Sequence, residues 1–175
     1  MIPVPDLTDP TAYFFPEDKV AGKEAFLDQW THPVETWMRA YALTQRELVE
    51  VLIPAALLAP QHIYVDRSQT LDANQLVLVK ELAAAPGIDI TVGTSPEGES
   101  FISHAKSTAR IDGLCWMGSW NFSESASSQV NHAIQFQSPT WRDALIAQFN
   151  LDCGWAWAHE SAYQVQTHQP QPRTA

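Results

Sequence analysis

The sequence is poor in positive charge. Lys and Arg together number 10 in 175 residues, against 20 Asp and Glu, and the formal net charge is −10. This balance excludes a protein that gathers nucleic acid through an overall positive field. A polyanionic substrate would have to be held by a local basic patch within a repelling field.

The sequence also lacks long apolar runs, cysteine frameworks and metal-ligand spacings. No run reaches the length of a membrane span, and the opening Met-Ile-Pro-Val-Pro lacks the basic and apolar regions of a signal peptide. The two cysteines, Cys115 and Cys153, lie in apolar segments, so we expect free thiols and a cytoplasmic location. The six histidines are scattered without ligand spacing, and we expect neither a metal nor a cofactor.

The remaining composition, 45% hydrophobic with seven Trp, is typical of a packed globule. We expect one domain over residues 1–158 and a disordered polar tail over 159–175. Hydrophobic periodicity predicts three strands separated by two helices, the strands covering residues 36–43, 62–66 and 88–92. This order favours an α/β fold with a mixed, largely parallel central sheet flanked by helices on both faces.

The two ends of the domain are less regular. Residues 1–17 are punctuated by proline and are expected to be extended. A last strand is predicted over 131–137, and Ser138-Pro139 is typical of a helix start. The final helix spaces five large side chains four residues apart, which predicts the stripe that faces the sheet: Trp141, Leu145, Phe149, Cys153 and Trp157.

One predicted strand, residues 103–111, carries an unusual set of side chains. Alternation places His104, Lys106, Thr108 and Arg110 on the same face. An imidazole, an ammonium group and a guanidinium group on one strand face call for an anionic partner.

The residues that follow bring further donors to this face. Asp112-Gly113 predicts a tight hairpin turn, and residues 114–117 form the returning strand. The strand ends in Gly118-Ser119-Trp120-Asn121, which adds a hydroxyl and a carboxamide. Together these groups offer what a tetrahedral phosphate needs around its oxygens.

His-x-Lys, followed twelve residues after the Lys by Gly-Ser-x-Asn, resembles the signature of the phospholipase D superfamily. The run Gly-Ser-Trp-Asn-Phe-Ser-Glu-Ser-Ala is most similar to the small, single-motif bacterial endonuclease branch, and a weaker resemblance covers residues 13–157. Two positions depart from the pattern. Ile111 stands where the family has Asp, with Asp112 one place later, and Asn131 and His132 are the nearest equivalents of a downstream Glu.

The resemblance implies a role for each residue of the motif. His104 would be the nucleophile and would form a phosphohistidine. Lys106 and Asn121 would hold the non-bridging oxygens, and Ser119 would bind the phosphate or orient the imidazole. The scheme requires no metal, because protein donors can neutralise the charge.

The neighbouring residues leave alternatives open. Arg110 would touch a neighbouring phosphate or lie in solvent, and Trp120 would stack on a base or belong to the core. Asn131 would orient His104 or cap the last strand. Asp112 and Gly118 are expected to be structural, since Asp112 lies eight residues along the strand from His104 at ~3.3 Å per residue, beyond hydrogen-bond reach.

The phosphohistidine scheme needs a second histidine for proton transfer, and no other His in the chain begins a His-x-Lys. We therefore expect a homodimer whose two-fold axis passes through a shared site. The predicted function is a metal-independent phosphodiesterase, an endonuclease acting on DNA or RNA. The alternatives are a phospholipase D-type phospholipid hydrolase and a phosphate-binding protein with weakened catalysis.

Overall fold

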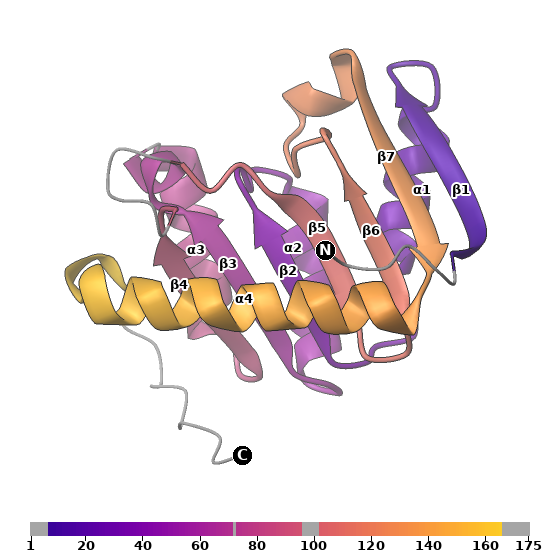
Figure 1. Cartoon of the computed structure of the whole chain (residues 1–175). Coiled ribbons are helices and arrows are strands. Elements are labelled where there is room, and N and C mark those ends of the chain that lie inside the picture. The colour runs from indigo at the N-terminus through magenta and orange to yellow at the C-terminus, as the bar shows by residue number, and fades with distance from the viewer. Residues whose placement is uncertain (1–6, 72, 96–101, 166–175) are drawn as a thin grey trace.

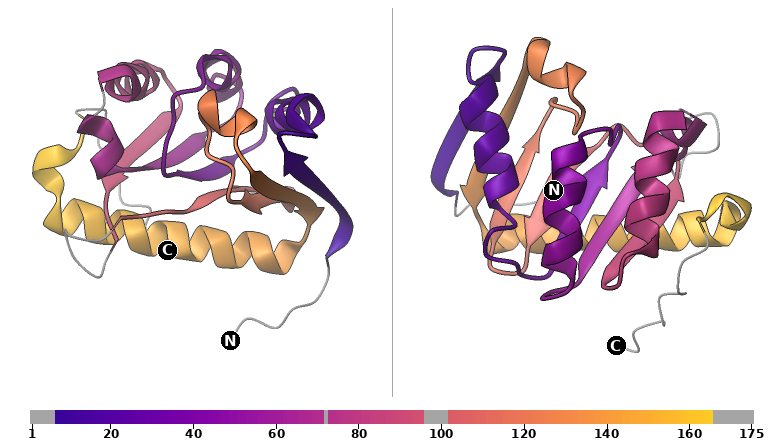
Figure 2. Two further views of the ribbon diagram at one scale, coloured as in Figure 1. Left: turned by 90° about the horizontal axis from the view of Figure 1, so that it is seen from above. Right: turned by 180° about the vertical axis from the view of Figure 1, so that it is seen from behind.

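The computed structural model describes residues 7–71, 73–95 and 102–165. Within these ranges a seven-stranded sheet carries helices on both faces, α1, α2 and α3 on one and α4 on the other (Figures 1 and 2). The strands are β1 (Thr8–Phe15), β2 (Thr36–Ala40), β3 (Gln61–Asp66), β4 (Ile88–Gly93), β5 (Lys106–Arg110), β6 (Leu114–Gly118) and β7 (Asn131–Gln137). The α-helices are α1 (Lys19–Asp28), α2 (Arg46–Ala56), α3 (Ala73–Ala84) and α4 (Pro139–His159).

The strand order is β1-β7-β6-β5-β2-β3-β4. The α/β class, the mixed sheet and the helices on both faces are confirmed, but the expectation of a largely parallel sheet is wrong. Only β2–β3 and β3–β4 are parallel, while the other four pairs are antiparallel. The parallel pairs are those joined by a helix, whereas β5 and β6 are joined by a short turn, which permits only antiparallel pairing.

The first strand was not predicted as part of the sheet. Residues 8–15, expected to be merely extended, pair antiparallel with β7 as the edge strand β1. No described helix is long and apolar enough to cross a membrane.

Strand directions bring five separate segments together at one end of the strands, which is not an outermost strand of the sheet. Because β5 runs antiparallel to β2 and to β6, the start of β5 lies beside the ends of β2 and β6. The start of β7 lies there too, since β7 is antiparallel to β6. The end of β3 joins them through its parallel pairing with β2. We call this the site edge.

The main core lies between the sheet and the face with α1, α2 and α3, and Phe26 of α1 is central to it. The Phe26 ring lies 5.2 Å from Trp30, 5.2 Å from Trp116, 5.1 Å from Trp120 and 4.5 Å from Phe122, measured between ring centroids. Ring pairs at these distances add attraction beyond their buried area.

The opposite face is covered by α4 alone. Ser138 caps this helix, as its sequence suggested, by accepting a hydrogen bond from the N–H of Trp141 at 3.2 Å. The expected stripe is only partly right: α4 buries Phe149 as expected, but Asp152 and Ala156 are the other fully buried residues. A strict spacing of four drifts off one face of a helix with 3.6 residues per turn.

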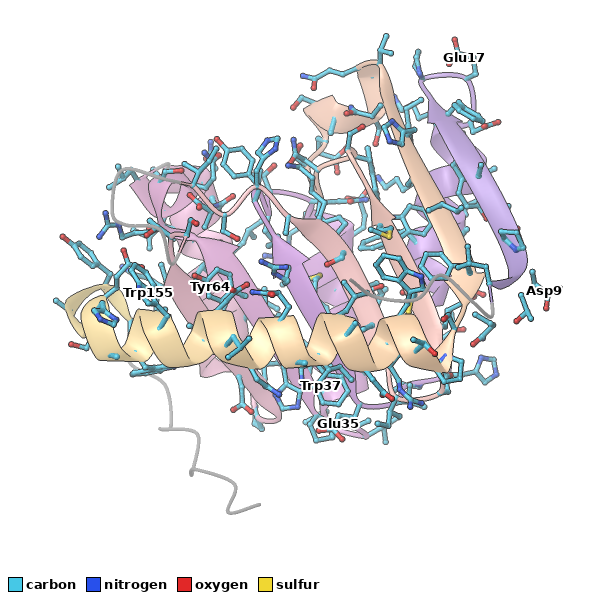
Figure 3. All side chains as sticks on the ribbon, in the orientation of Figure 1. Asp9, Glu17, Glu35, Trp37, Tyr64 and Trp155 are labelled. Carbon is cyan, nitrogen blue, oxygen red and sulfur yellow. The ribbon has the colours of Figure 1, made fainter. Side chains whose placement is uncertain are left out.

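A smaller cluster forms beneath α4. Tyr64 of β3 lies there with its ring centroid 6.4 Å from that of Phe149, and Trp155 packs at the same place (Figure 3). Cys153 of this cluster and Cys115 are both free thiols, and burial raises the pKa of each to about 12.

The expected tail boundary at residue 159 is too early. Glu160 is fully buried and accepts hydrogen bonds from the backbone N–H of Thr94 at 2.7 Å and from its hydroxyl at 3.0 Å. The Glu160 carboxylate also pairs with Arg67 at 2.9 Å. The Gln164 side chain accepts from the N–H of Val92 at 2.9 Å and donates to its carbonyl at 2.6 Å. The packed part therefore reaches at least residue 165, and residues 166–175 lie outside the described ranges.

Replacing Phe26 with Ala should lower the free energy of unfolding by about 3–5 kcal/mol, because it opens a cavity at the centre of the aromatic core. Leu58→Ala is the matched control, since the Leu58 side chain is 77% exposed and its loss should cost less than ~1 kcal/mol. Urea denaturation followed by tryptophan fluorescence measures both. Equal losses in the two variants would contradict this account of the core.

Candidate active site

His104 and Lys106 meet at the site edge beside Tyr41. His104 precedes β5 and is exposed, and its ring meets the Tyr41 ring edge-on with 4.6 Å between centroids. Lys106 opens β5 and is only 4% exposed. Its Nζ donates a hydrogen bond to the His104 carbonyl at 2.6 Å and lies 4.9 Å from the centre of the Tyr41 ring. Tyr41 therefore contacts both side chains: the His104 ring edge-on, and the Lys106 ammonium through a cation–π contact.

Asp66, at the end of β3, anchors the segment that carries His104. Its buried carboxylate accepts hydrogen bonds from the backbone N–H of Ser103 and from both the N–H and the hydroxyl of Ser68. Sequence reasoning placed Asp66 at the end of a buried strand but gave it no role. The available signal was a carboxylate at the end of an apolar strand that reaches the same sheet edge.

The surroundings lower the pKa of both Lys106 and His104. Burial lowers the pKa of Lys106 to about 8, and the negative charge of Asp66 opposes part of this shift. Burial also lowers the pKa of His104 below its ordinary value, and the nearby charge of Lys106 acts in the same direction, against Asp66. At pH 7 the imidazole is therefore mostly neutral and the ammonium mostly charged. A neutral imidazole has the free lone pair that a nucleophile needs.

Ser119 follows β6 and joins it to the start of β7. Its Oγ accepts a hydrogen bond from the backbone N–H of His132 at 3.0 Å. The same oxygen lies 3.2 Å from Asn131 Oδ1 and 3.3 Å from His132 Nδ1. Asn131 is fixed in turn, because its Nδ2 donates to the Ala126 carbonyl at 2.9 Å. Asn131 thus contacts Ser119, and the structure gives it no contact with His104.

Asn121 lies two residues further on, in a segment tied to the start of α2. The backbone N–H groups of Thr44 and Gln45 donate to the Phe122 carbonyl at 2.9 and 3.2 Å. The Asn121 Oδ1 atom is buried and has no hydrogen-bond partner among the described residues. An unpaired buried carbonyl oxygen is costly to the folded state, whereas the Nδ2 of the same amide can donate to a phosphate oxygen.

Gly118 is required by the close approach of β6 and β7. A Cβ atom at this position would lie 2.2 Å from the His132 carbonyl oxygen and 2.7 Å from the Ala133 Cα. Any side chain would push the two strands apart and move Ser119 away from His132.

The structure places Arg110 and Asp112 away from the site edge, which corrects the expected position of Arg110. Arg110 ends β5, four residues from Lys106, or about 13 Å along a strand. Its guanidinium is buried, pairs with Asp112 at 2.7 Å and donates to the carbonyls of Gln29 and His32. Alternation identified the strand face correctly, but not the distance along it. Asp112 lies in the turn and accepts from the N–H of Leu114 at 3.3 Å.

Trp120 belongs to the core, which corrects its expected role in stacking on a base. The side chain is 0% exposed and stacks on Phe15 at 5.1 Å with an interplanar angle of 4°. Its Nε1–H donates to Ser127 Oγ at 3.2 Å, so its polar group is satisfied inside the protein.

Other charged groups offer little to a phosphate. Each arginine in the described ranges pairs with at least one carboxylate: Arg39, Arg46, Arg67, Arg110 and Arg142. Lys106 is the cation that lies directly beside His104. Across the described residues no group of three or more His, Cys, Asp or Glu side chains could hold a metal ion.

A second histidine with carboxylate partners, His62, lies near the start of β3, at the end of the strands opposite the site edge. His62 Nε2 is 3.0 Å from Glu35 and its Nδ1 is 3.1 Å from Asp89, while its ring stacks on Trp37 (Figure 3). Both ring nitrogens of His62 thus face carboxylates of the protein, away from the site edge.

Comparison with known proteins finds relatives by structure only. No model of a protein family matches the sequence, and no curated protein matches it either. NucT from Helicobacter pylori superposes with a TM-score of 0.73 at 11% identity, over 84% of this chain and 96% of that one. Nuc from Salmonella typhimurium, a phospholipase D family member, gives 0.72 at 17% identity over the same shares. Part of the polyphosphate kinase from Porphyromonas gingivalis gives 0.65 at 16% identity, over 95% of this chain and 27% of that one. The chain therefore has the phospholipase D fold.

Proposed function

We propose that the protein is a phosphodiesterase that uses His104 as its nucleophile. The observation that carries this proposal is a mostly neutral, exposed imidazole held next to a buried ammonium group at the site edge. The phospholipase D fold, which this chain shares with Nuc over 96% of that chain, supports the same proposal.

The reaction proceeds in two displacements. In the first, a ring nitrogen of His104 attacks phosphorus, the bond to the leaving oxygen breaks, and that oxygen takes a proton from an acid. In the second, water gives up a proton, attacks the phosphohistidine and releases His104. Lys106 and Asn121 bind the non-bridging oxygens, where negative charge grows in each transition state. Lys106 is suited to this task because it is already desolvated, which strengthens its attraction for an oxyanion.

The proton-transfer group is supplied by a second copy of the chain, with two His104 residues facing each other across a two-fold axis. Exposed apolar side chains near the site edge support such a contact. Ile102 lies two residues before His104 and is 47% exposed, Val130 is 92% exposed, and the exposed Phe14 pairs with His132 across β1 and β7. Exposed apolar groups that gather around a site are typical of an interface.

The substrate is a nucleic acid, cleaved internally, and the site itself contacts only the scissile phosphate. Two observations favour a second candidate, a phospholipid. The apolar groups around the site edge suit a neutral-tailed diester, and each arginine of the described residues is engaged by a carboxylate. The third possibility, a phosphate-binding protein without turnover, is separated from both by the first experiment below.

The wild-type protein should hydrolyse a phosphodiester, and His104→Ala should remove that activity, since no nucleophile remains. Plasmid DNA, RNA, phosphatidylcholine and a chromogenic diester are assayed, each with and without EDTA, which should change nothing. His159→Ala is the matched control, because His159 is exposed near the end of α4. Cleavage by His104→Ala would contradict the proposal, and inactivity of the wild type on every substrate would leave phosphate binding as the function.

The pH dependence of kcat/KM should show two limbs. Activity needs Lys106 charged and, in the shared site, one His104 neutral while the partner's is protonated, so it should pass through a maximum near the lowered pKa of His104, below 6.5. Above about 8 Lys106 loses its charge as well, and Lys106→Arg should lessen the decline there, since a guanidinium stays charged. NMR of labelled lysine gives the Lys106 pKa directly. A value near the ordinary 10.4 would contradict the desolvated site.

Purified heterodimers with one His104→Ala subunit should lose multiple turnover, because each shared site would lack one histidine. Sedimentation at micromolar concentration should show a dimer. A monomer that cleaves diesters, or a heterodimer with full activity, would rule out the shared site.

A further inference from the structure

Lys106 is a buried cation that forms no ion pair with any carboxylate in the described part of the chain. Its side chain is 4% exposed, and its Nζ donates a hydrogen bond to the His104 carbonyl at 2.6 Å. The negative charge of Asp66 acts on it from a distance, but the Asp66 carboxylate is taken up by hydrogen bonds from Ser68 and Ser103. Burying an ammonium group without a paired charge is costly, so the single carbonyl oxygen needs support from another group.

The ring of Tyr41 lies where it can give that support. Ala40, the last residue of β2, pairs with Lys106 across the sheet, so Tyr41 leaves β2 beside the segment that enters β5. The Lys106 Nζ lies 4.9 Å from the ring centroid, inside the ~6 Å range of a cation–π attraction. The same ring is half-buried and lies 4.6 Å from the His104 ring, measured between centroids. One aromatic side chain therefore contacts both groups that the proposed reaction uses.

A second cation over a ring differs from Lys106 in one respect. Arg67 lies 4.3 Å from the centroid of the Tyr163 ring, but it also pairs with the buried Glu160 at 2.9 Å. That carboxylate neutralises the charge of Arg67, whereas Lys106 has a ring without a carboxylate. A ring face attracts a cation through its quadrupole and carries no net charge. The positive field of Lys106 therefore stays available to a substrate.

We propose that the face of the Tyr41 ring is the counter-group of Lys106: it keeps the buried ammonium charged without neutralising it, and it holds Nζ beside His104. Tyr41 is thus a positioning residue, which acts on the substrate phosphate through Lys106. A carboxylate in its place would compete with the phosphate for the ammonium, whereas a ring does not. This role rests on the proposed function of the site, and it adds a residue that lies outside the His-x-Lys and Gly-Ser-x-Asn motifs.

Three influences determine the protonation of Lys106. Burial favours the neutral amine and lowers the pKa to about 8, while the charge of Asp66 favours the ammonium. The Tyr41 face also favours the ammonium, so its loss should lower the pKa further. A cation–π attraction in a desolvated site corresponds to about one pKa unit.

Other ionisable groups of the site edge do not take the place of the ring. The pKa of His104 is lowered below its ordinary value, so its imidazole is neutral in the range where Lys106 titrates. Beside the start of α2, Glu47 and Glu124 are both held by Lys23, at 2.6 Å and 3.6 Å. A change in the Lys106 titration therefore reports on the ring.

The test varies the electron density of the ring at nearly constant size. Phenylalanine and its mono-, di- and trifluoro forms are placed at position 41 alone by nonsense suppression, and each fluorine weakens the attraction of the ring face for a cation. NMR of labelled lysine should give the wild-type Lys106 pKa in Tyr41→Phe. The pKa should then fall stepwise across the fluorinated series, by about one unit in total. A Lys106 pKa that stays the same across the series overturns the proposal, whether or not the protein is active.

Tyr163→Leu is the matched control, because the Tyr163 ring faces a cation that already has a carboxylate. This variant should leave the Lys106 pKa unchanged, whereas Tyr41→Leu should lower it as far as the trifluoro form does. A shift of the same size in both leucine variants would overturn the assignment to Tyr41.

Turnover of the chromogenic diester gives a second readout. A Lys106 pKa one unit lower roughly halves the ammonium form at pH 7 and reduces it about fivefold at pH 8. The trifluoro form should therefore lower kcat/KM about fivefold at pH 8 and approach the wild type as the pH falls. A loss of the same size at every pH would indicate altered packing and overturn the electrostatic role. If the wild type hydrolyses no diester while the pKa still falls across the series, the proposed function fails and the role of Tyr41 stands.

Discussion

The register of the β5–β6 hairpin is the constraint on which the site depends. Its turn is fixed by Asp112, which pairs with Arg110 and accepts the N–H of Leu114, and by Gly113, whose φ of +98° suits a residue without a side chain. A slip by one residue would exchange the two faces of the strand. Lys106 would then leave the core side, and Ser119 would no longer meet His132. The positions of the residues at the site edge therefore depend on a turn at the opposite end of β5 and β6.

Charge is distributed so that a single buried ammonium group, that of Lys106, lies beside His104. The protein carries a net charge of −10, and each described arginine is held by a carboxylate. Lys106 has no such partner and pairs instead with a carbonyl and an aromatic face. A buried ammonium group without a carboxylate favours binding of an anion, because the anion replaces the favourable interactions with water that the ammonium lost on folding. Attraction is therefore short-ranged, in a molecule that repels polyanions at a distance.

Local pattern predicted much of this structure and some of its site. The strand that carries Lys106, the strand that ends just before Ser119, the turn at Asp112 and the cap at Ser138 all follow from alternation and turn chemistry, although the strand expected from residue 103 begins only at Lys106. The pattern could not show that Arg110 lies at the wrong end of its strand, because alternation gives a face and not a position relative to a partner.

Other features depended on tertiary contacts that no local pattern reports. Trp120 is buried by Phe15 and Phe26, which are distant in sequence. The sheet is mostly antiparallel because β5, β6 and β7 follow one another in alternating directions and β1, distant in sequence, pairs antiparallel with β7. Asp66 acquired a role only when the fold placed it against Ser103.

The contacts of Gln164 and Glu160 with β4 bear on how copies of this protein can meet. At Val92 both backbone groups are taken by the Gln164 side chain, and the N–H of Thr94 is taken by Glu160. A short stretch of chain thus lies where a neighbouring strand would otherwise bind at the end of β4. Copies of the protein therefore cannot continue the sheet past these positions of β4.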